Sequence, residues 1–378
     1  MFRKTYALID KDILSDNVKE ITSKYPQYEY YFGVVKGNCY GHGFGAVNAL
    51  IKGGVNYIAV SSAEEALAVR EQNGEIPILV LEPVSSEFFD VAEQQKITLT
   101  VDSLERFEET LKSGRKLSVH IKIDSGMNRL GIKDKTELNR LFEDYGKAEN
   151  VLIEGIYTHL ATSGVNDKFY DIQVENFKKI TADIDLKSIP IVHIGRSLIL
   201  VHHKKPDFVN GVRLGICMYG FSQSLPVPTG LRKIKRDLML KNRKISETVL
   251  SNDLKLKTAM TVKTEIMAVK NVKKGEFLGY GAEYIADCDL TVATLPIGYF
   301  DGVEKGMKYV YLNGKRREIL GEVCMDMITV RADKNTKIGD TAEIFGENIS
   351  VRETARNLGV SSYRVLTGIT SRVPRIYK

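Results

Sequence analysis

Short apolar runs alternate with amphipathic stretches of helical period between residues 29 and 217, and this alternation restricts the fold more than any other feature of the chain. Eight runs read as strands: 29–35, 56–61, 77–81, 97–101, 118–124, 152–159, 190–194 and 211–217. The amphipathic stretches between them include 63–72, 104–112, 135–145 and 168–184. Because parallel strands need long crossovers that are usually helical, the pattern predicts a (β/α)8 barrel of the TIM type. The connection after 190–194 is short, and the pattern indicates a helix there only weakly.

The rest of the chain is predicted to form a second, mainly β domain. Residues 221–230 carry two prolines and two serines, which is typical of a linker, and 231–244 hold seven basic residues against one aspartate. Strand-like runs then follow at 261–269, 290–295, 309–312, 318–323, 328–332 and 341–345. We therefore expect an α/β protein with a barrel of residues 1–230, a basic linker or insertion of residues 231–256 and a C-terminal β domain of residues 257–378. The segment 1–10 is expected to pair with the β domain.

Composition excludes several classes of function. The formal charge of the 378 residues is only +6 and no long basic stripe is present, so nucleic acid is not expected as a partner. No stretch approaches the ~20 apolar residues that span a bilayer, and the first residues lack the apolar core of a signal peptide. Four cysteines are scattered without metal-ligand or paired spacing, so no metal site is predicted. We expect a cytoplasmic protein, or a soluble domain cut from a membrane-anchored one.

One lysine, Lys36, directly follows the first apolar run and precedes the glycine-rich segment 37–43. Schiff-base chemistry needs a lysine amine held by a rigid element, with glycines that let other groups approach closely. A lone lysine at a strand end is more often a solvated surface residue. Whether Lys36 is a Schiff-base lysine or a surface residue therefore depends on the other residues of the predicted site.

Polar side chains also lie within or just after the ends of other predicted strands, at the end of the barrel where the active sites of such barrels lie. These residues are Lys122, Asp124, Arg129, His159, Ser197 and Arg213. Each has a plain structural alternative, such as a buried histidine or half of an ion pair, but their coincidence on one face favours a site. A lysine amine together with a phosphate site on the loops after the last two strands suits pyridoxal 5'-phosphate.

The chain resembles the alanine racemases, which are fold-type III pyridoxal phosphate enzymes, over almost its full length. The matching segments are 6–10 (YALID), 17–18 (NV), 35–43 (VKGNCYGHG), 122–131 (KIDSGMNRLG), 158–159 (TH), 212–216 (VRLGI), 219–220 (YG), 279–281 (GYG), 295–299 (LPIGY), 301–302 (DG), 324–326 (CMD) and 371–375 (SRVPR). Each motif alone is weak evidence. Their number, order and spacing identify the chain as a member of this family.

The resemblance implies a two-base mechanism at the substrate α-carbon. Lys36 would bind the cofactor and act as the base on one face, and Tyr280 would act on the other face, donated across a head-to-tail homodimer. His159 and Arg213 would form a hydrogen-bonded chain that tunes the tyrosine. Arg213 would face the pyridine nitrogen, which a guanidinium keeps unprotonated. Tyr284 is the alternative catalytic tyrosine, although its place in the motif favours packing.

The resemblance also implies the binding residues. Arg129 would contact the phenolic oxygen of the cofactor and the substrate carboxylate, with the Met325 backbone as the second partner of that carboxylate. Lys122 matches a lysine that is carbamylated in many members, where the added carboxylate orients the arginine. The phosphate cradle would comprise Tyr40, Ser197, Gly215 and Ile216, and Tyr299 would lie at the substrate entrance.

The sequence departs from the family pattern at three places, of which the first two, Arg196 and Ser371, bear on the substrate. Arg196 precedes Ser197 where an asparagine is expected, and it either grips phosphate, grips a second substrate carboxylate or points outward. Ser371 replaces a tyrosine that narrows the pocket in some alanine racemases, which leaves room for a side chain larger than methyl. The basic segment 231–244 is longer than expected and is interpreted as a solvated insertion rather than a specific contact.

The leading hypothesis is racemisation of L-alanine to D-alanine for peptidoglycan synthesis. Serine racemases of the vancomycin-resistance type share this scaffold, so serine or a wider range of amino acids is the alternative; one small group in a pocket is worth only ~1–3 kcal/mol. A barrel that binds pyridoxal phosphate without turnover is less favoured, because such proteins lack a second domain with counterparts of Tyr280 and Met325. A decarboxylase would need a phosphate loop and a cysteine motif that the sequence lacks.

Overall fold

The computed structural model of the chain describes residues 2–162, 168–221, 230–231, 234–235, 238 and 254–378. The chain divides into two compact units. One comprises residues 15–36 and 47–256, and the other comprises residues 1–14, 37–46 and 257–378. Most of the predicted linker 221–230 and of the basic segment 231–244 lies outside the described residues.

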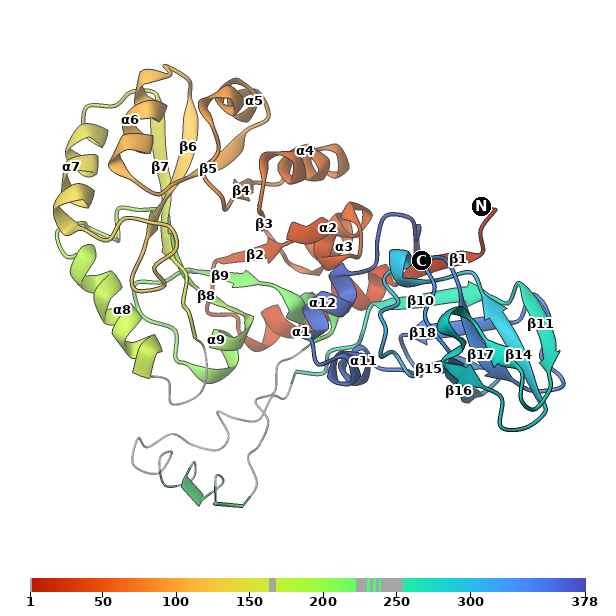
Figure 1. Ribbon diagram of the computed structural model, residues 1–378. Helices are drawn as coiled ribbons and strands as arrows, with labels where there is room; N and C mark the ends of the chain where they lie inside the picture. The colour runs from red at the N-terminus through yellow and green to blue at the C-terminus, as the bar shows by residue number, and fades with distance from the viewer. Residues whose placement is uncertain (1, 163–167, 222–229, 232–233, 236–237, 239–253) are drawn as a thin grey trace. The chain divides into compact units, whose positions relative to one another are not determined.

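The first unit contains a closed barrel of eight parallel strands (Figure 1). In order around the barrel they are β2 (Tyr30–Val34), β3 (Tyr57–Val60), β4 (Ile78–Val80), β5 (Ile97–Val101), β6 (Leu117–Ile123), β7 (Val151–Thr158), β8 (Ile191–Arg196) and β9 (Gly211–Leu214). Parallel strands covered on both faces read as nearly continuous apolar runs, which is why the sequence locates them well. The predicted TIM-type barrel followed by a mainly β region is confirmed.

Helices connect the barrel strands. Helix α1 (Lys11–Lys24) precedes the first barrel strand, and the connecting helices are α3 (Val47–Gly53), α4 (Ala63–Gln72), α5 (Phe89–Gln94), α6 (Leu104–Lys112), α7 (Lys135–Tyr145), α8 (Lys168–Ile180) and α9 (Ser197–His202). Local sequence sets several of their first turns: the side chain of Ser103 accepts a hydrogen bond from Arg106 N at the start of α6, and Asp134 does the same at α7. The weak connection after the seventh barrel strand is a helix of six residues, α9.

The second unit is built on a nine-stranded sheet with the order β11-β14-β17-β16-β15-β18-β10-β1-β19. These strands are β1 (Thr5–Ile9), β10 (Met260–Glu265), β11 (Ala268–Val272), β14 (Leu290–Leu295), β15 (Tyr309–Leu312), β16 (Lys315–Leu320), β17 (Ile328–Ala332), β18 (Thr341–Phe345) and β19 (Arg375–Tyr377). A two-stranded hairpin of β12 (Phe277–Leu278) and β13 (Tyr284–Ile285) and the helices α11 (Val351–Leu358) and α12 (Ser362–Thr367) complete the unit. The N-terminal strand β1 pairs with β10 and with β19.

Some predicted elements were wrong in detail. The run 261–269 forms two strands, β10 and β11, because Ile266 bonds through its backbone to Gly339 and Asp340 and leaves the ladder between them. The run 211–217 ends as a strand at Leu214, and a 3-10 turn, η3 (Ile216–Tyr219), follows. Helix α8 ends at Ile180 rather than at residue 184. No helix among the described residues has the length and apolarity that a membrane crossing requires.

Candidate active site

Lys36 comes directly after β2, and the backbone that follows it is unusual. Gly37, Asn38, Cys39 and Tyr40 all have φ between 51° and 62°, so the chain makes one left-handed helical turn. Such a conformation costs about 1–2 kcal/mol for each residue with a side chain. It is fixed here by the hydrogen bond from Gly41 N to Gly37 O (2.9 Å) and by Arg375, whose Nε donates to Gly41 O (2.8 Å). The backbone next to the lysine is therefore strained and rigid.

The Lys36 side chain is exposed and makes no hydrogen bond or ion pair to any residue that the structure describes. Tyr40 lies in the left-handed turn, and its ring is 5.7 Å from that of Tyr363. A Cβ at Gly41 would lie 2.2 Å from Leu366 O, so this turn requires glycine at that position.

Arg213 is held in the barrel interior near the end of β9. Its NH1 lies 2.5 Å from His193 Nδ1, and its NH2 donates to Thr158 O at 2.8 Å. His159 Nδ1 is 3.5 Å from NH2, which is a weak contact. Burial lowers the pKa of Arg213 to about 10, so the guanidinium remains charged at neutral pH. Its many acceptors leave it little freedom to reorient.

Positive charges are concentrated at this end of the barrel. Burial, and then the charges of Arg213, Arg196 and Arg129, lower the pKa of His159 to about 2, so its imidazole is neutral at physiological pH. Burial and the charges of Arg213 and Arg129 also lower the pKa of Lys122 to about 8. These mutual effects show that the structure brings Lys36, Lys122, Arg129, His159, Arg196 and Arg213 together. A surplus of cations favours an anionic ligand.

Lys122 is buried near the end of β6, with its Nζ 5.3 Å from the centre of the Tyr157 ring. No carboxylate among the described residues forms an ion pair with it. A buried amine without a counter-ion loses its proton more easily than a solvated one. This environment suits a lysine that reacts in its neutral form.

Asp124 organises the loop that carries Arg129. Its carboxylate accepts hydrogen bonds from the backbone N–H groups of Gly126 (3.0 Å), Asn128 (3.0 Å) and Arg129 (3.1 Å). The Arg129 side chain is exposed. The aspartate therefore fixes the backbone of the loop and leaves the guanidinium available to a ligand.

Ser197 links the two loops that follow the last barrel strands. Its Oγ accepts hydrogen bonds from Gly215 N (2.9 Å) and from the buried Cys217 thiol (2.9 Å), which leaves the hydroxyl proton for another partner. Ile216 begins η3 directly after Gly215. The Gly215 N–H is engaged by Ser197 Oγ, so the donor that this turn offers to an anion is the Ser197 hydroxyl, which lies beside a cluster of cations. A hydroxyl donor in such a positive environment fits the phosphate of pyridoxal phosphate. Half-buried Arg196 stands beside Ser197 at the end of β8.

The other predicted residues lie in the second unit. Tyr280 sits between β12 and β13 with 74% of its surface exposed. Tyr284 differs, because its hydroxyl accepts a hydrogen bond from Arg331 NH2 at 3.1 Å. Tyr299 and Met325 are half-exposed neighbours: Tyr299 N donates to Cys324 O (3.0 Å), and Met325 O accepts from Arg372. Ser371 is exposed next to Arg372.

Sequence reasoning missed the polar groups inside the barrel. His120 and His193 are fully buried, and Glu154 reaches toward them from β7. In the sequence, each of these residues appears as a histidine or glutamate within an otherwise apolar run. A single buried histidine in a strand has no evident partner in the sequence, because 73 residues separate His120 from His193.

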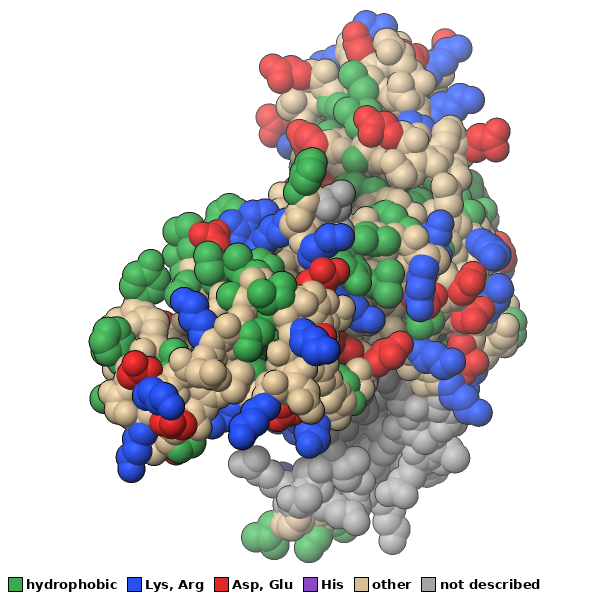
Figure 2. Space-filling model, turned by 90° about the vertical axis from the view of Figure 1, so that its right-hand side faces the viewer, with side chains coloured by type: hydrophobic (Ala, Val, Ile, Leu, Met, Phe, Trp, Pro, Cys, Tyr) green, Lys and Arg blue, Asp and Glu red, His purple; other side chains and the backbone are tan. Residues whose placement is uncertain are grey.

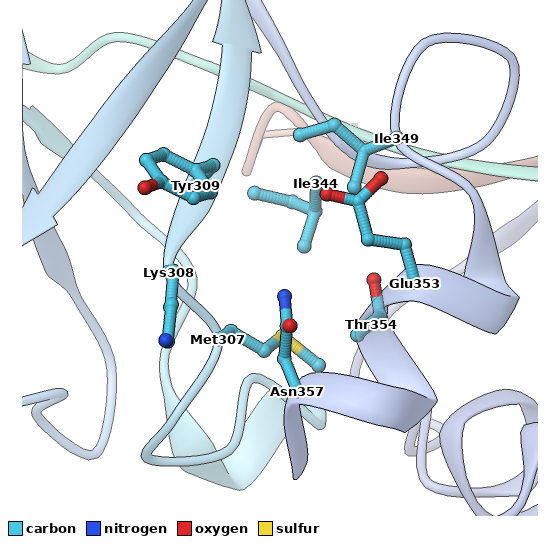
Figure 3. A pocket seen from close by; sticks show the side chains of 8 residues that line it. All are labelled: Met307, Lys308, Tyr309, Ile344, Ile349, Glu353, Thr354 and Asn357. Atoms are coloured by element: carbon cyan, nitrogen blue, oxygen red, sulfur yellow. The ribbon is translucent and has the colours of Figure 1, made fainter.

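A small pocket in the second unit lies apart from all the predicted site residues (Figure 3). Its lining comes from β15 and the two residues before it, from β18, and from α11 and the turn before it, and comprises Met307, Lys308, Tyr309, Ile344, Ile349, Glu353, Thr354 and Asn357. The carboxylate of Glu353 is already engaged by Arg316. This pocket therefore offers little to a charged ligand.

Comparisons with known proteins agree with the geometry. Residues 9–223 match the family described as alanine racemase, N-terminal domain, and residues 259–377 match alanine racemase, C-terminal domain. Alanine racemase 1 of Bacillus subtilis (strain 168) is 32% identical over 100% of this chain and 93% of its own length. The crystal structure of alanine racemase from E. faecalis superposes with a TM-score of 0.87, at 29% identity over 100% of this chain and 98% of that one.

The same fold also occurs in an enzyme named for another amino acid. The histidine racemase from Leuconostoc mesenteroides subsp. sake NBRC 102480 has a TM-score of 0.86 and 24% identity over 100% of this chain and 98% of its own. At that identity the likeness shows the fold alone. The architecture by itself therefore does not fix the substrate.

Proposed function

Because this chain belongs to the alanine racemase family of pyridoxal phosphate enzymes, we propose that it interconverts L- and D-alanine with pyridoxal phosphate bound through Lys36. The product D-alanine would supply peptidoglycan synthesis. The observation that carries the proposal is the single exposed lysine at the end of β2 beside a cluster of cations at the same end of the barrel. Free thiols at all four cysteines support a cytoplasmic location.

The residues present fit the cofactor. Lys36 offers an amine that no described residue engages, and Ser197 offers a hydroxyl beside the Gly215–Ile216 turn. Tyr40, from the turn directly after the lysine, would add a second hydroxyl. Bound pyridoxal phosphate supplies an electron sink that stabilises negative charge at the substrate α-carbon. The protein's own task is then to bind, to orient and to move one proton.

Two bases on opposite faces account for racemisation, because the proton must leave one side of the α-carbon and return on the other. We assign the Lys36 amine to one face and the Tyr280 hydroxyl to the other. Exposed Tyr280 is available to a partner, whereas the hydroxyl of Tyr284 is engaged by Arg331. His159 is neutral and contacts Arg213, so it would transmit the influence of the Arg213 charge to the Tyr280 hydroxyl.

Arg213 would face the pyridine nitrogen of the cofactor. Its guanidinium is fixed by Thr158 and His193 and stays charged at neutral pH. A group that keeps its protons leaves the ring nitrogen unprotonated, which weakens the electron sink and limits side reactions such as transamination. An arginine is therefore suited to racemisation, which needs only a modest sink.

Arg129 would bind the substrate carboxylate, and Lys122 would orient it after carbamylation. The reaction joins the neutral amine to carbon dioxide and releases one proton. With its pKa lowered to about 8, roughly one-tenth of Lys122 is neutral at pH 7. The carbamate would carry a negative charge into a group of cations, which stabilises it. The Met325 backbone would hold the other side of the substrate carboxylate, and Tyr299 would stand at the entrance.

A head-to-tail homodimer would deliver Tyr280, Tyr299 and Met325 to the partner's barrel. Apolar side chains are exposed on two parts of the second unit: Phe277 and Ile285 lie in the hairpin that carries Tyr280, and Phe300, Met325 and Met327 lie on the segments around Tyr299. The hairpin pairs Phe277 with Ile285, and Phe300 N donates to Met325 O. Figure 2 shows hydrophobic side chains at the surface among charged ones. Exposed apolar side chains that gather on these two segments favour an interaction surface there.

Exchange of the α-proton in heavy water, followed by NMR, tests the function and its substrate. We expect fast exchange with L- and D-alanine in the presence of pyridoxal phosphate and slower exchange with serine. Serine exchange equal to or faster than that of alanine would instead assign serine or a wider range of amino acids, with Ser371 and Arg196 as the residues to substitute first. Absence of exchange with both would favour a barrel that binds the cofactor without turnover.

A further inference from the structure

Behind Arg213, a line of polar side chains runs through the apolar interior of the barrel. Arg213 NH1 lies 2.5 Å from His193 Nδ1, and His193 Nε2 lies 2.9 Å from His120 Nδ1. His120 Nε2 faces Glu154 Oε2 at 3.5 Å. Both histidines are fully buried, and the Glu154 side chain is 25% exposed. The line thus connects a buried cation to a carboxylate with partial access to water.

The direction of each hydrogen bond follows from chemistry. A guanidinium only donates, so His193 Nδ1 must accept and its proton must be on Nε2. That proton is donated to His120 Nδ1, which places the proton of His120 on Nε2, toward Glu154. A doubly protonated His120 would donate from Nδ1 and leave His193 unable to accept from Arg213. Both imidazoles are therefore neutral Nε2–H tautomers, and all donors point from Arg213 toward Glu154.

The fold is adapted to this line. In the pairing of β6 with β7, Val119 lies opposite Ile153 but His120 lies opposite Gly155, so Glu154 is an extra residue at a bulge. A Cβ at Gly155 would lie 2.6 Å from His120 Nδ1, so the imidazole occupies the space of a side chain. The His193 ring is stacked between Phe32 (4.4 Å) and Tyr157 (4.6 Å). These contacts fix both rings in the orientation that the hydrogen bonds need.

Arg213 forms no ion pair with a carboxylate in the part of the chain that the structure describes. A buried charge without a counter-ion is costly. At the far end of the line, Glu154 also accepts hydrogen bonds from Tyr57 OH (2.8 Å) and Thr98 Oγ1 (3.0 Å), which favour its ionised form. The 3.5 Å contact between His120 Nε2 and Glu154 is longer than a normal hydrogen bond, and His120 Nε2 makes no hydrogen bond to any described residue.

We propose that Glu154 is the counter-ion of Arg213, coupled to it through His120 and His193, and that these three side chains are positioning residues for racemisation. Through aligned, neutral imidazoles the carboxylate strengthens His193 Nδ1 as an acceptor and holds the guanidinium in place. The part of this inference that concerns catalysis rests on the proposed function, in which Arg213 faces the cofactor. The coupling itself is a property of the protein alone.

Nitrogen NMR of the 15N-histidine-labelled protein, without added cofactor, tests the coupling in the unmodified chain. We expect the resonances of His120 and His193, assigned by His120→Asn and His193→Asn, to report Nε2–H tautomers at neutral pH. An Nδ1–H tautomer or an imidazolium at either position would overturn the proposal. This measurement needs no substitution at Glu154, so it holds even if variants there fold poorly.

Glu154→Gln then removes the charge and keeps an acceptor of the same shape. We expect the His193 Nδ1 resonance to move toward that of an imidazole nitrogen without a hydrogen bond, and kcat to fall about 10-fold, as is typical when an outer partner of a functional group is removed. Glu343→Gln is the matched control, since Glu343 is a buried carboxylate in β18 bonded to Asn348 and Ile349. Glu343→Gln should leave the His193 Nδ1 resonance and kcat unchanged.

The NMR resonance and kcat together distinguish a failure of this inference from a failure of the proposed function. An unshifted His193 resonance in Glu154→Gln would overturn the coupling, whatever the enzyme catalyses. A shifted resonance with an unchanged kcat would overturn the positioning role. If the unmodified enzyme did not racemise any amino acid, the proposed function would fail, and the NMR result would still decide whether Glu154 is the counter-ion.

Discussion

Arg3 forms a two-pronged ion pair with Asp301, a residue 298 positions later in the chain, through two contacts of 2.6 Å. Arg372 binds the same carboxylate at 2.7 and 2.9 Å, and Gly298 N donates to it at 2.9 Å. The Asp301 side chain is fully buried. This one carboxylate therefore joins the N-terminal segment, the turn that carries Tyr299 and the C-terminal segment of the second unit.

Asp301→Asn should destabilise the protein, because it leaves two arginines without their shared counter-ion. We expect a loss of about 2–3 kcal/mol in the free energy of unfolding, measured by urea denaturation. Asp326→Asn is the control: Asp326 binds the same Arg372 but is half-exposed, so its loss should cost less than about 1 kcal/mol. Equal costs for the two variants would contradict the central role of Asp301.

The same carboxylate predicts the pH dependence of stability. Burial opposes its ionisation, but hydrogen bonds from Arg3 and Arg372 outweigh that effect and lower the pKa of Asp301 from 3.8 to about 2. A carboxylate whose pKa is lower in the folded protein than in the unfolded chain stabilises the fold at pH values above its unfolded pKa. That stabilisation is lost as the pH falls through the pKa of the folded state. The unmodified protein should therefore lose about 1–2 kcal/mol relative to Asp301→Asn between pH 4 and pH 2. Parallel acid-unfolding curves for the two proteins would refute this.

Lys122 should carry a carbamate that depends on pH. Only the neutral amine reacts with carbon dioxide, and burial together with Arg213 and Arg129 lowers the pKa of Lys122 to about 8. With 13C-labelled bicarbonate, a carbamate carbon signal should appear in the NMR spectrum and grow as the pH rises from 7 to 9. Lys122→Arg should abolish the signal. Its persistence in that variant would place the modification on another lysine.

Tyr280→Phe should lower racemisation in at least one direction by about 100-fold or more, the scale expected for loss of a general acid or base. The cofactor should remain bound, as judged by its absorption. Tyr284→Phe is the matched control, because its hydroxyl only accepts a hydrogen bond from Arg331, and its activity should stay near that of the unmodified enzyme. The reverse ranking would assign the catalytic role to Tyr284.

Gly155→Ala should disturb the barrel interior. The added Cβ would lie 2.6–2.8 Å from three atoms of the His120 ring, which is fully buried and held by its contact with His193. We expect a cost of about 1–3 kcal/mol in thermal or urea unfolding. Gly74→Ala, where no atom lies within 4 Å of the new Cβ, should change stability by less than about 0.5 kcal/mol.

The local pattern of apolar residues was sufficient to predict the barrel strands and some strands of the second unit. The strands β5, β14, β15, β17 and β18 begin and end where their apolar runs do. Helices α11 and α12 were not anticipated, although Ser350 and Ser361 cap their first turns. The sequence predicted that segment 1–10 pairs with the β domain but did not identify β19 as a partner strand, because three residues at the end of the chain carry too little pattern to reveal a partner hundreds of positions away.

The sequence by itself determined the alternation that makes the barrel, the position of Lys36 at a strand end and the family to which the chain belongs. These are properties of neighbouring residues, and periodicity and short motifs record them directly. Only the tertiary structure decided that Arg213, His193, His120 and Glu154 form one line, and that Arg3 and Arg372 share Asp301. The physical reason is that such contacts depend on strand register and on bulges such as the one at Glu154, which arise when distant segments pack together and leave no periodic trace in the chain.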